Sequence, residues 1–209
     1  MFEVLTGAGL ATAAGLNAYI PLLAIGLLSR FTDLVNLPTG WAWLENGWVQ
    51  LILGVLLVIE IIADKVPAVD SVNDWIQTIV RPAAGGIVFG SGTAAQTATV
   101  TDPASFFTSN AWVPIAIGVL LALTVHVGKT LVRPAANVAT AGFAAPVLST
   151  AEDIFSAVMS VVALLLPVLV ILGIAGLVAS AIGLARRIRR RRADAPPVPP
   201  VPTPGGTPG

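Results

Sequence analysis

The feature that most constrains this chain is a series of apolar windows long enough to cross a lipid bilayer. A helix needs roughly 20 mainly apolar residues to cross the hydrocarbon core. Four windows meet or approach that length, at residues 4–29, 49–63, 113–127 and 154–185. Because 56% of the residues are hydrophobic and only 11% are charged, disorder and most soluble folds are excluded for the bulk of the chain. We therefore expect an all-α integral membrane protein.

Two weaker windows lie between these four, at residues 82–100 and 134–149. Both are rich in Gly, Ala and Thr rather than Leu. Hydropathy alone therefore leaves them open between short spans, re-entrant hairpins and buried loops. Counted with the four strong windows, they predict about six transmembrane or partly re-entrant helices.

The placement of charged and aromatic residues favours six crossings. Cytoplasmic flanks of membrane helices collect Lys and Arg, and indole rings favour the headgroup region. With six crossings, Arg30 alone among the basic residues falls on the outer face. The tryptophans that then fall in the two outer loops are Trp41, Trp43, Trp48 and Trp112. This topology places both termini in the cytoplasm, and we expect the membrane to be the bacterial cytoplasmic (inner) membrane.

The composition changes sharply after residue 192. Residues 1–192 are expected to form a helical membrane domain, whereas residues 193–209 are rich in Pro and Gly and cannot pack a core. We expect that segment to be a disordered cytoplasmic tail. The six arginines from Arg186 to Arg192 either anchor the topology or bind anionic headgroups, each contributing about 1 kcal/mol near an anionic surface.

An internal repeat relates two segments of the chain. Residues 48–65 align without gaps on residues 112–129, with seven of eighteen positions identical, and an Arg-Pro-Ala-Ala run follows each segment at residues 81–84 and 133–136. The repeat predicts two parallel units, at about 48–100 and 112–150, each with a helix ending at a lysine, a basic turn and a weak helix started by proline. The alternative is that leucine-rich spans resemble one another by composition.

Two carboxylates lie close together in the second window. An ionisable side chain at membrane depth costs about 3 kcal/mol on insertion scales, so each one is a functional candidate until a partner is found. Glu60 and Asp64 share one helix face and repel unless one is protonated or a cation lies between them. The alternative for Asp64 is a position at the water boundary. The candidate charge partners are Lys65, Arg81, Lys129 and Arg133.

Other polar residues lie at membrane depth. His126 is the single histidine, and it either serves proton coupling or lies at the interface. Asn17 and Tyr19 precede Pro21, which frees a carbonyl one turn back. A polar kink there is typical of a discontinuous binding helix, although a hydrogen bond between helices is the alternative for Asn17. The spacing of Gly86 and Gly90 predicts close helix packing.

Several runs resemble a bacterial family of small integral membrane proteins catalogued as a domain of unknown function. The runs are Gly15-Leu-Asn-Ala-Tyr-Ile-Pro-Leu, Glu60-Ile-Ile-Ala-Asp-Lys-Val-Pro-Ala-Val-Asp, Arg81-Pro-Ala-Ala-Gly and Ser149-Thr-Ala-Glu-Asp. The resemblance covers about residues 6–167. It implies a membrane location and no particular activity.

We therefore expect a small permease or channel that moves an ion or small polar solute through a polar path between the repeat halves. The alternative is a non-catalytic membrane scaffold or lipid-interacting protein. The chain lacks cysteine and the usual hydrolase and metalloprotease motifs, so we expect no enzyme activity, no cofactor and no metal. Expected partners are the bilayer, anionic headgroups and a possible homo-oligomer, but no nucleic acid. The residues expected to line the path are Asn17, Tyr19, Glu60, Asp64 and His126.

Overall fold

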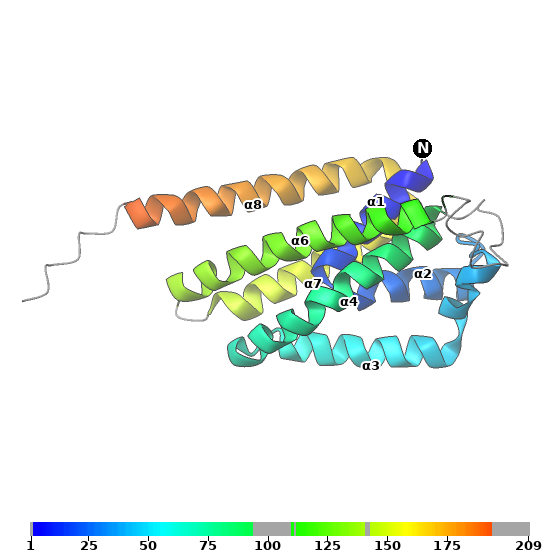
Figure 1. Ribbon diagram of the computed structural model, residues 1–209, viewed down its shortest axis with the longest axis horizontal. Coiled ribbons are helices and arrows are strands. Elements are labelled where there is room, and N and C mark those ends of the chain that lie inside the picture. The colour runs from blue at the N-terminus through cyan, green and yellow to red at the C-terminus, as the bar shows by residue number, and fades with distance from the viewer. Residues whose placement is uncertain (1, 94–109, 111, 141–142, 194–209) are drawn as a thin grey trace, which may run out of the picture.

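The computed structural model describes residues 2–93, 110, 112–140 and 143–193, and every regular element in this part of the chain is a helix (Figure 1). The elements in chain order are α1 (Phe2–Leu16), α2 (Tyr19–Phe31), η1 (Thr39–Glu45), α3 (Gly47–Ala63), α4 (Pro67–Thr93), α6 (Trp112–Ala139), α7 (Ala144–Leu165), η3 (Pro167–Leu169) and α8 (Val170–Ala193). The predicted tail lies almost wholly outside the described residues.

The helices are apolar on their outer surfaces, as expected for a chain that faces lipid. Within the described residues, α6 and α7 are long and apolar enough to cross a membrane, and η1 with α3 is a third candidate if this pair, bent by 61°, is one span. The large apolar residues of α3 that are more than half exposed are Trp48, Leu51, Ile52, Val55, Val58, Ile59 and Ile62. Five charged side chains are instead buried inside the bundle, namely Glu60, Asp64, Arg81, Lys129 and Arg133. The expected class, an all-helical membrane protein, agrees with this arrangement.

The window 4–29, predicted as one span, is a helical hairpin. The helix breaks after Leu16, and Asn17 Oδ1 accepts hydrogen bonds from the backbone N–H groups of Tyr19 and Ile20, which starts α2. Gly7 of α1 packs against the end of α4, and Gly26 of α2 packs against Leu44 of η1. Because η1 in turn covers Gly90 near the end of α4, the outer ends of both helices lie at the same end of the bundle and the tip lies inside it (Figure 1).

The window 154–185, also predicted as one crossing, reverses direction. Helix α7 ends at Leu165, η3 turns the chain, and α8 runs back along α7, so that Gly173 packs against Met159 (Figure 1). Leu166 is not helical, since the residue before a proline is disfavoured in the α conformation. The window therefore forms a second hairpin, which turns at Pro167, in place of one crossing.

The two weak windows are not separate helices. In the described part of the first window, residues 82–93 continue α4 through Pro82, and residues 134–139 and 144–149 belong to α6 and α7. Arg133 follows Lys129 by only four positions, about one helical turn, so α6 continues through this connection. The longer first connection leaves room for a turn before α4. The units thus differ in structure, and neither six spans nor the repeat is confirmed.

The bundle has two chemically distinct ends. We call the end with η1 and the start of α6 the tryptophan end, because Trp41, Trp48 and Trp112 lie there. We call the opposite end, at which α8 ends, the arginine end. Helices α3, α6 and α8 run toward the arginine end, whereas α4 and α7 run back (Figure 1). The start of α1 lies at the tryptophan end, opposite the end of α8, and the cytoplasmic position of both termini stays a prediction.

Helices α4 and α6 make the closest approach in the core. A Cβ on Gly118 of α6 would strike the carbonyl oxygen of Gly85, and Gly86 and Gly90 both face Ile115. Glycine is required at this crossing because the backbones themselves are in contact.

We expect Gly118→Ala to lower stability by about 2 kcal/mol, since the added methyl must push α4 away. The matched control is Gly128→Ala in the same helix, where nothing lies within 4 Å of an added Cβ. That change should leave the unfolding midpoint unchanged or raise it slightly, because alanine favours helix. Thermal unfolding followed by tryptophan fluorescence in detergent measures both, and equal midpoints for the two variants would contradict the close approach.

Candidate functional site

Three carboxylates and three cations from four helices meet inside the bundle. We call this group the ion cluster; its members are Glu60, Asp64, Arg81, Lys129, Arg133 and Glu152. The side chains of five members are at most 3% exposed, and that of Glu152 is 17% exposed. With equal numbers of each sign, the cluster carries no net charge, which is the condition under which charges can remain buried.

Asp64 lies at the centre of the ion cluster, immediately after the last residue of α3. Its Oδ2 atom is 3.1 Å from Lys129 Nζ, 3.3 Å from Arg133 Nη2 and 3.5 Å from Arg81 Nη2. Its Oδ1 atom accepts a hydrogen bond of 2.7 Å from Asn73 Nδ2. Asp64 therefore faces three cations through one carboxylate oxygen and an amide through the other.

The other two carboxylates extend the cluster in opposite directions. Glu60 Oε1 lies 2.8 Å from Arg81 Nη2, on the α3 and α4 side. Glu152 Oε2 lies 2.6 Å from Arg133 Nη2 and 3.2 Å from Lys129 Nζ, on the α6 and α7 side. The second oxygen of Glu60 is buried and accepts no hydrogen bond from the described residues. Glu60 is thus the least satisfied carboxylate of the cluster.

His126 adjoins the cluster as a neutral ring. Its Nδ1 atom lies 3.4 Å from Arg81 Nη1, which can only donate, so Nδ1 must accept. The Nε2 atom then carries the proton and donates to Thr78 Oγ1 at 3.1 Å, while Thr78 donates to the Asp74 carbonyl. A second proton on His126 would point at the guanidinium of Arg81, so this geometry holds the ring uncharged.

The tip of the α1–α2 hairpin forms a separate polar contact. The Asn17 side chain is fully buried, and its Nδ2 atom donates a hydrogen bond of 2.9 Å to Asp153 Oδ1. Nearby, Ser156 Oγ donates to the carbonyl oxygen of Ala13 in the last turns of α1. Helix α7 therefore holds the broken helix through two polar side chains.

The structure brings some of the sequence-predicted residues together and separates others. Glu60, Asp64 and His126 meet, with Arg81, Lys129 and Arg133 as their partners. Lys65 does not join them, because its Nζ atom donates to the carbonyl of Ile61. Asn17 binds Asp153 instead, whereas Tyr19, buried in the first turn of α2, lies near Glu60 and Arg81 of the cluster.

Sequence reasoning missed Glu152 and Asp153. Both lie between two predicted windows, at 134–149 and 154–185, and so fell in an outer loop. In the structure they lie well inside α7, which begins at Ala144. The signal that could have revealed them is that two adjacent acids stand between two apolar windows. If both windows belong to one helix, these acids lie at membrane depth and need partners.

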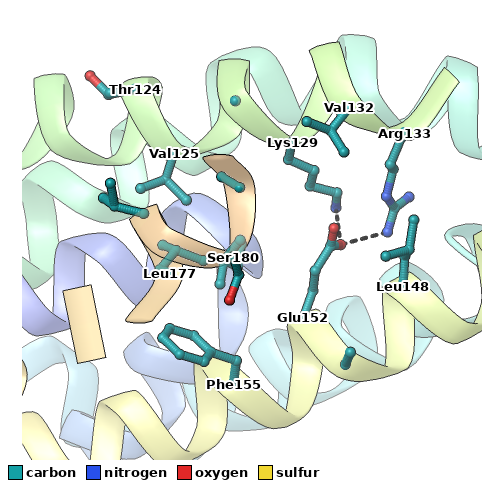
Figure 2. Close-up of a pocket in the computed structure, with 15 residues that line it drawn as sticks. Thr124, Val125, Lys129, Val132, Arg133, Leu148, Glu152, Phe155, Leu177 and Ser180 are labelled. Carbon is teal, nitrogen blue, oxygen red and sulfur yellow. Dashed lines mark hydrogen bonds and ion pairs between the residues drawn. The ribbon is translucent and has the colours of Figure 1, made fainter. Parts of the chain in front are cut away.

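A groove lies beside the ion cluster, between α6, α7 and α8. Its volume is about 390 Å³, and most of the residues that line it are apolar. Figure 2 shows Lys129 and Arg133 pointing toward Glu152 on one wall, with Leu177 and Ser180 of α8 nearby. We call it the α8 groove. Among the described residues, no group of three His, Asp or Glu side chains is arranged to hold a metal ion.

A helical bundle with an apolar exterior and two or three helices that are long and apolar enough to cross a bilayer is typical of a membrane protein. The chain belongs to the family described as Domain of unknown function (DUF4126), which matches residues 4–187 and so includes the hairpin, the ion cluster and the α8 groove. Searches of curated proteins and of solved structures each found no match.

We expect Asp64→Asn to lower stability by about 3 to 5 kcal/mol, because it leaves one buried positive charge without compensation. Thermal unfolding in detergent measures the loss, with the exposed Asp33→Asn as the control for removal of an acid.

Adding Lys129→Met to Asp64→Asn restores a neutral cluster. We expect the double variant to be more stable than the sum of the two single losses predicts, because the two changes act on one ion pair. Additive losses would show that Asp64 and Lys129 do not interact.

Proposed function

We propose that this protein is a small membrane permease or channel that moves an ion or small polar solute past the tip of the α1–α2 hairpin. The observation that carries the proposal is the helix break at Asn17, buried inside the bundle against Asp153. Discontinuous helices that end inside membrane proteins commonly form substrate sites, because their terminal backbone groups are free to bind a ligand. A hairpin used only for packing does not need an acid at its tip.

The chemistry of the tip favours a cation. The C-terminal end of α1 carries the negative end of its helix dipole, while two backbone N–H groups at the positive end of α2 are already occupied by Asn17 Oδ1. Asp153 adds a carboxylate whose hydrogen-bond donor is a neutral amide, not a cation. A proton or a small monovalent cation therefore suits this site better than an anion.

The ion cluster is suited to act as the gate between this site and the arginine end. Gly15, near the tip, packs against Ala122 and Val125 of α6, whereas Lys129 and Arg133 follow farther along the same helix. Four helices meet through the cluster, so separating them exchanges ion pairs for water. In the closed arrangement described here, the charges neutralise one another and exclude water.

The distribution of basic residues supports an orientation. Cytoplasmic ends of membrane helices collect Lys and Arg, and the arginine-rich end of α8 lies at the same end as Lys65. We place that end in the cytoplasm of a bacterial cell. The start of α1 then faces the outside, in place of the cytoplasmic position expected from the sequence.

The scaffold interpretation remains the second candidate, and one observation favours it. Glu60 and Asp64 face cation partners in a closed cluster and are 1% and 2% exposed. A protein that only assembles in the membrane could use such a cluster to hold its helices in register. Flux separates the two candidates.

The test of transport uses purified protein in liposomes with proton, sodium and potassium gradients, read by entrapped ion-sensitive dyes. We expect wild-type protein to pass at least one of these cations, and Asp153→Asn to reduce the flux at least tenfold because the carboxylate at the tip is lost. Asp33→Asn, at an exposed position, is the control for charge removal. No flux above that of empty liposomes, or equal flux from wild type and Asp153→Asn, would refute the proposal.

A second variant tests the gate. Glu60→Gln removes one ion pair with Arg81 and leaves the tip intact, so we expect a leak at least threefold above the wild-type flux. Equal flux from the two proteins would remove the gating role of Glu60. Chromatographic profile and unfolding midpoint show whether the variant has kept its fold.

A further inference from the structure

Three buried polar atoms beside the ion cluster have no hydrogen-bond partner among the described residues. They are Glu60 Oε2, Gln77 Oε1 and Arg81 Nε. The three residues are 1%, 2% and 0% exposed, respectively. Buried polar atoms in folded proteins are nearly always hydrogen-bonded, either to protein or to water. These atoms therefore indicate a site for a small polar ligand.

The three atoms belong to side chains that meet between α3 and α4. Gln77 and Arg81 are one helical turn apart, so their side chains lie on one face of α4. The ion pair of 2.8 Å between Arg81 Nη2 and Glu60 Oε1 brings the carboxylate of α3 to the same face. Tyr19 of α2 lies near all three side chains. We call this place the Glu60 site, and its members are Tyr19, Glu60, Gln77 and Arg81.

The numbers of donors and acceptors select the ligand. Arg81 Nε donates, whereas Glu60 Oε2 and Gln77 Oε1 accept. An anion cannot donate to the two oxygens, and a metal ion cannot accept from the guanidinium, which also repels it. One water molecule can donate to both oxygens and accept from Nε, and buried waters typically make about three hydrogen bonds. Water therefore fits this site.

The same water also fits a protonated Glu60. A proton on Oε2 turns that oxygen from an acceptor into a donor, and the water has a second lone pair to accept it. The water still accepts from Arg81 Nε and donates to Gln77 Oε1. The hydroxyl oxygen of Tyr19, which lies nearby, can accept its other hydrogen. The Glu60 site can thus satisfy the carboxyl group in either protonation state.

Glu60 is the carboxylate of the ion cluster that loses least when it is neutralised. In the part of the chain that the structure describes, Glu60 makes one ion pair, Glu152 makes two and Asp64 makes three. A proton on Glu60 therefore breaks the fewest ion pairs. The groups that face Glu60, directly or through Arg81, are Tyr19 from α2, Asp64 from α3, Arg81 from α4, and His126 and Lys129 from α6.

We infer that the Glu60 site binds a proton on Glu60 Oε2, delivered through one water held by Gln77 and Arg81, and that the bound proton opens the gate. The O–H bond forms on Oε2 as a hydronium ion from solvent gives up a proton and becomes the bound water. The cluster then carries one excess positive charge, so the helices that it joins separate more readily. The inference rests on the proposed gate and adds the proton as the ligand that controls it.

Infrared spectroscopy of the purified full chain in detergent detects the proton directly. A protonated carboxyl group has a C=O stretching band that a carboxylate lacks. We expect one such band to appear in the wild type between about pH 8 and about pH 6, a range in which exposed carboxyl groups stay ionised. Glu60→Gln should lack this band, and its unfolding midpoint shows whether the variant has kept its fold.

Two buried glutamines provide a matched pair of variants for the water. Gln77→Leu removes an acceptor that holds the water, so the ionised form of Glu60 loses a donor. The midpoint of the infrared band should then move to higher pH by about 0.5 unit or more. Gln50→Leu is the same change at the opposite end of α3, where Gln50 donates to the carbonyl of Leu44, and it should leave the midpoint unchanged.

A single cysteine reports the opening without any measurement of flux, because the chain has no cysteine of its own. Ser149 is fully buried, one turn before Glu152 on the side of the arginine end. We expect a water-soluble maleimide to label Ser149→Cys at least fivefold faster at pH 6 than at pH 8, relative to the exposed Asp33→Cys at the same pH. Adding Glu60→Gln should give the faster relative rate at both pH values.

Three results would overturn the inference. An infrared band that is missing from the wild type, or that persists in Glu60→Gln, would show that Glu60 does not bind the proton. An unchanged midpoint in Gln77→Leu would remove the water. Relative labelling that does not depend on pH would show that the proton does not open the gate. Liposomes without flux would refute transport alone, since the band and the labelling are measured without it.

Discussion

The attraction between Asp64 and three cations is the interaction on which the arrangement of four helices depends. Each of α4 and α6 brings positive charge that needs Asp64, and α7 supplies Glu152 to balance the remainder. A slip of one turn along any helix moves a charge by 5.4 Å and leaves it buried without a partner. The cluster therefore fixes the register of these helices more strictly than apolar packing does, since apolar faces tolerate small shifts.

Hydropathy and charge predicted the class of protein and five of the six members of the ion cluster, because charges inside apolar windows must find partners of opposite sign. They could not predict the chain reversals in windows 4–29 and 154–185. Hydropathy is averaged over a window and contains no information on the direction of the chain, so one long helix and a hairpin give the same profile. The break at Asn17 also depends on a tertiary partner, Asp153, that lies 136 residues away in the chain.

The sequence match between residues 48–65 and 112–129 takes on a different meaning beside the cluster. Asp64 aligns with Gly128, and Glu60 aligns with Thr124, so the acids occur in the first segment alone. The second segment supplies Lys129, which binds Asp64. The two similar segments thus contribute opposite charges to the ion cluster. An alignment of similar residues does not reveal this relation.

The order of synthesis gives the cluster a consequence for biogenesis. Asp64 precedes Lys129 by 65 residues, which a ribosome covers in roughly 3 to 13 s. During that interval Arg81, soon to follow on α4, is the sole cation of the cluster that the nascent chain has made. Until Lys129 emerges on α6, the inserted hairpin of α3 and α4 therefore carries one uncompensated negative charge. The insertion machinery must accommodate this charge during that interval.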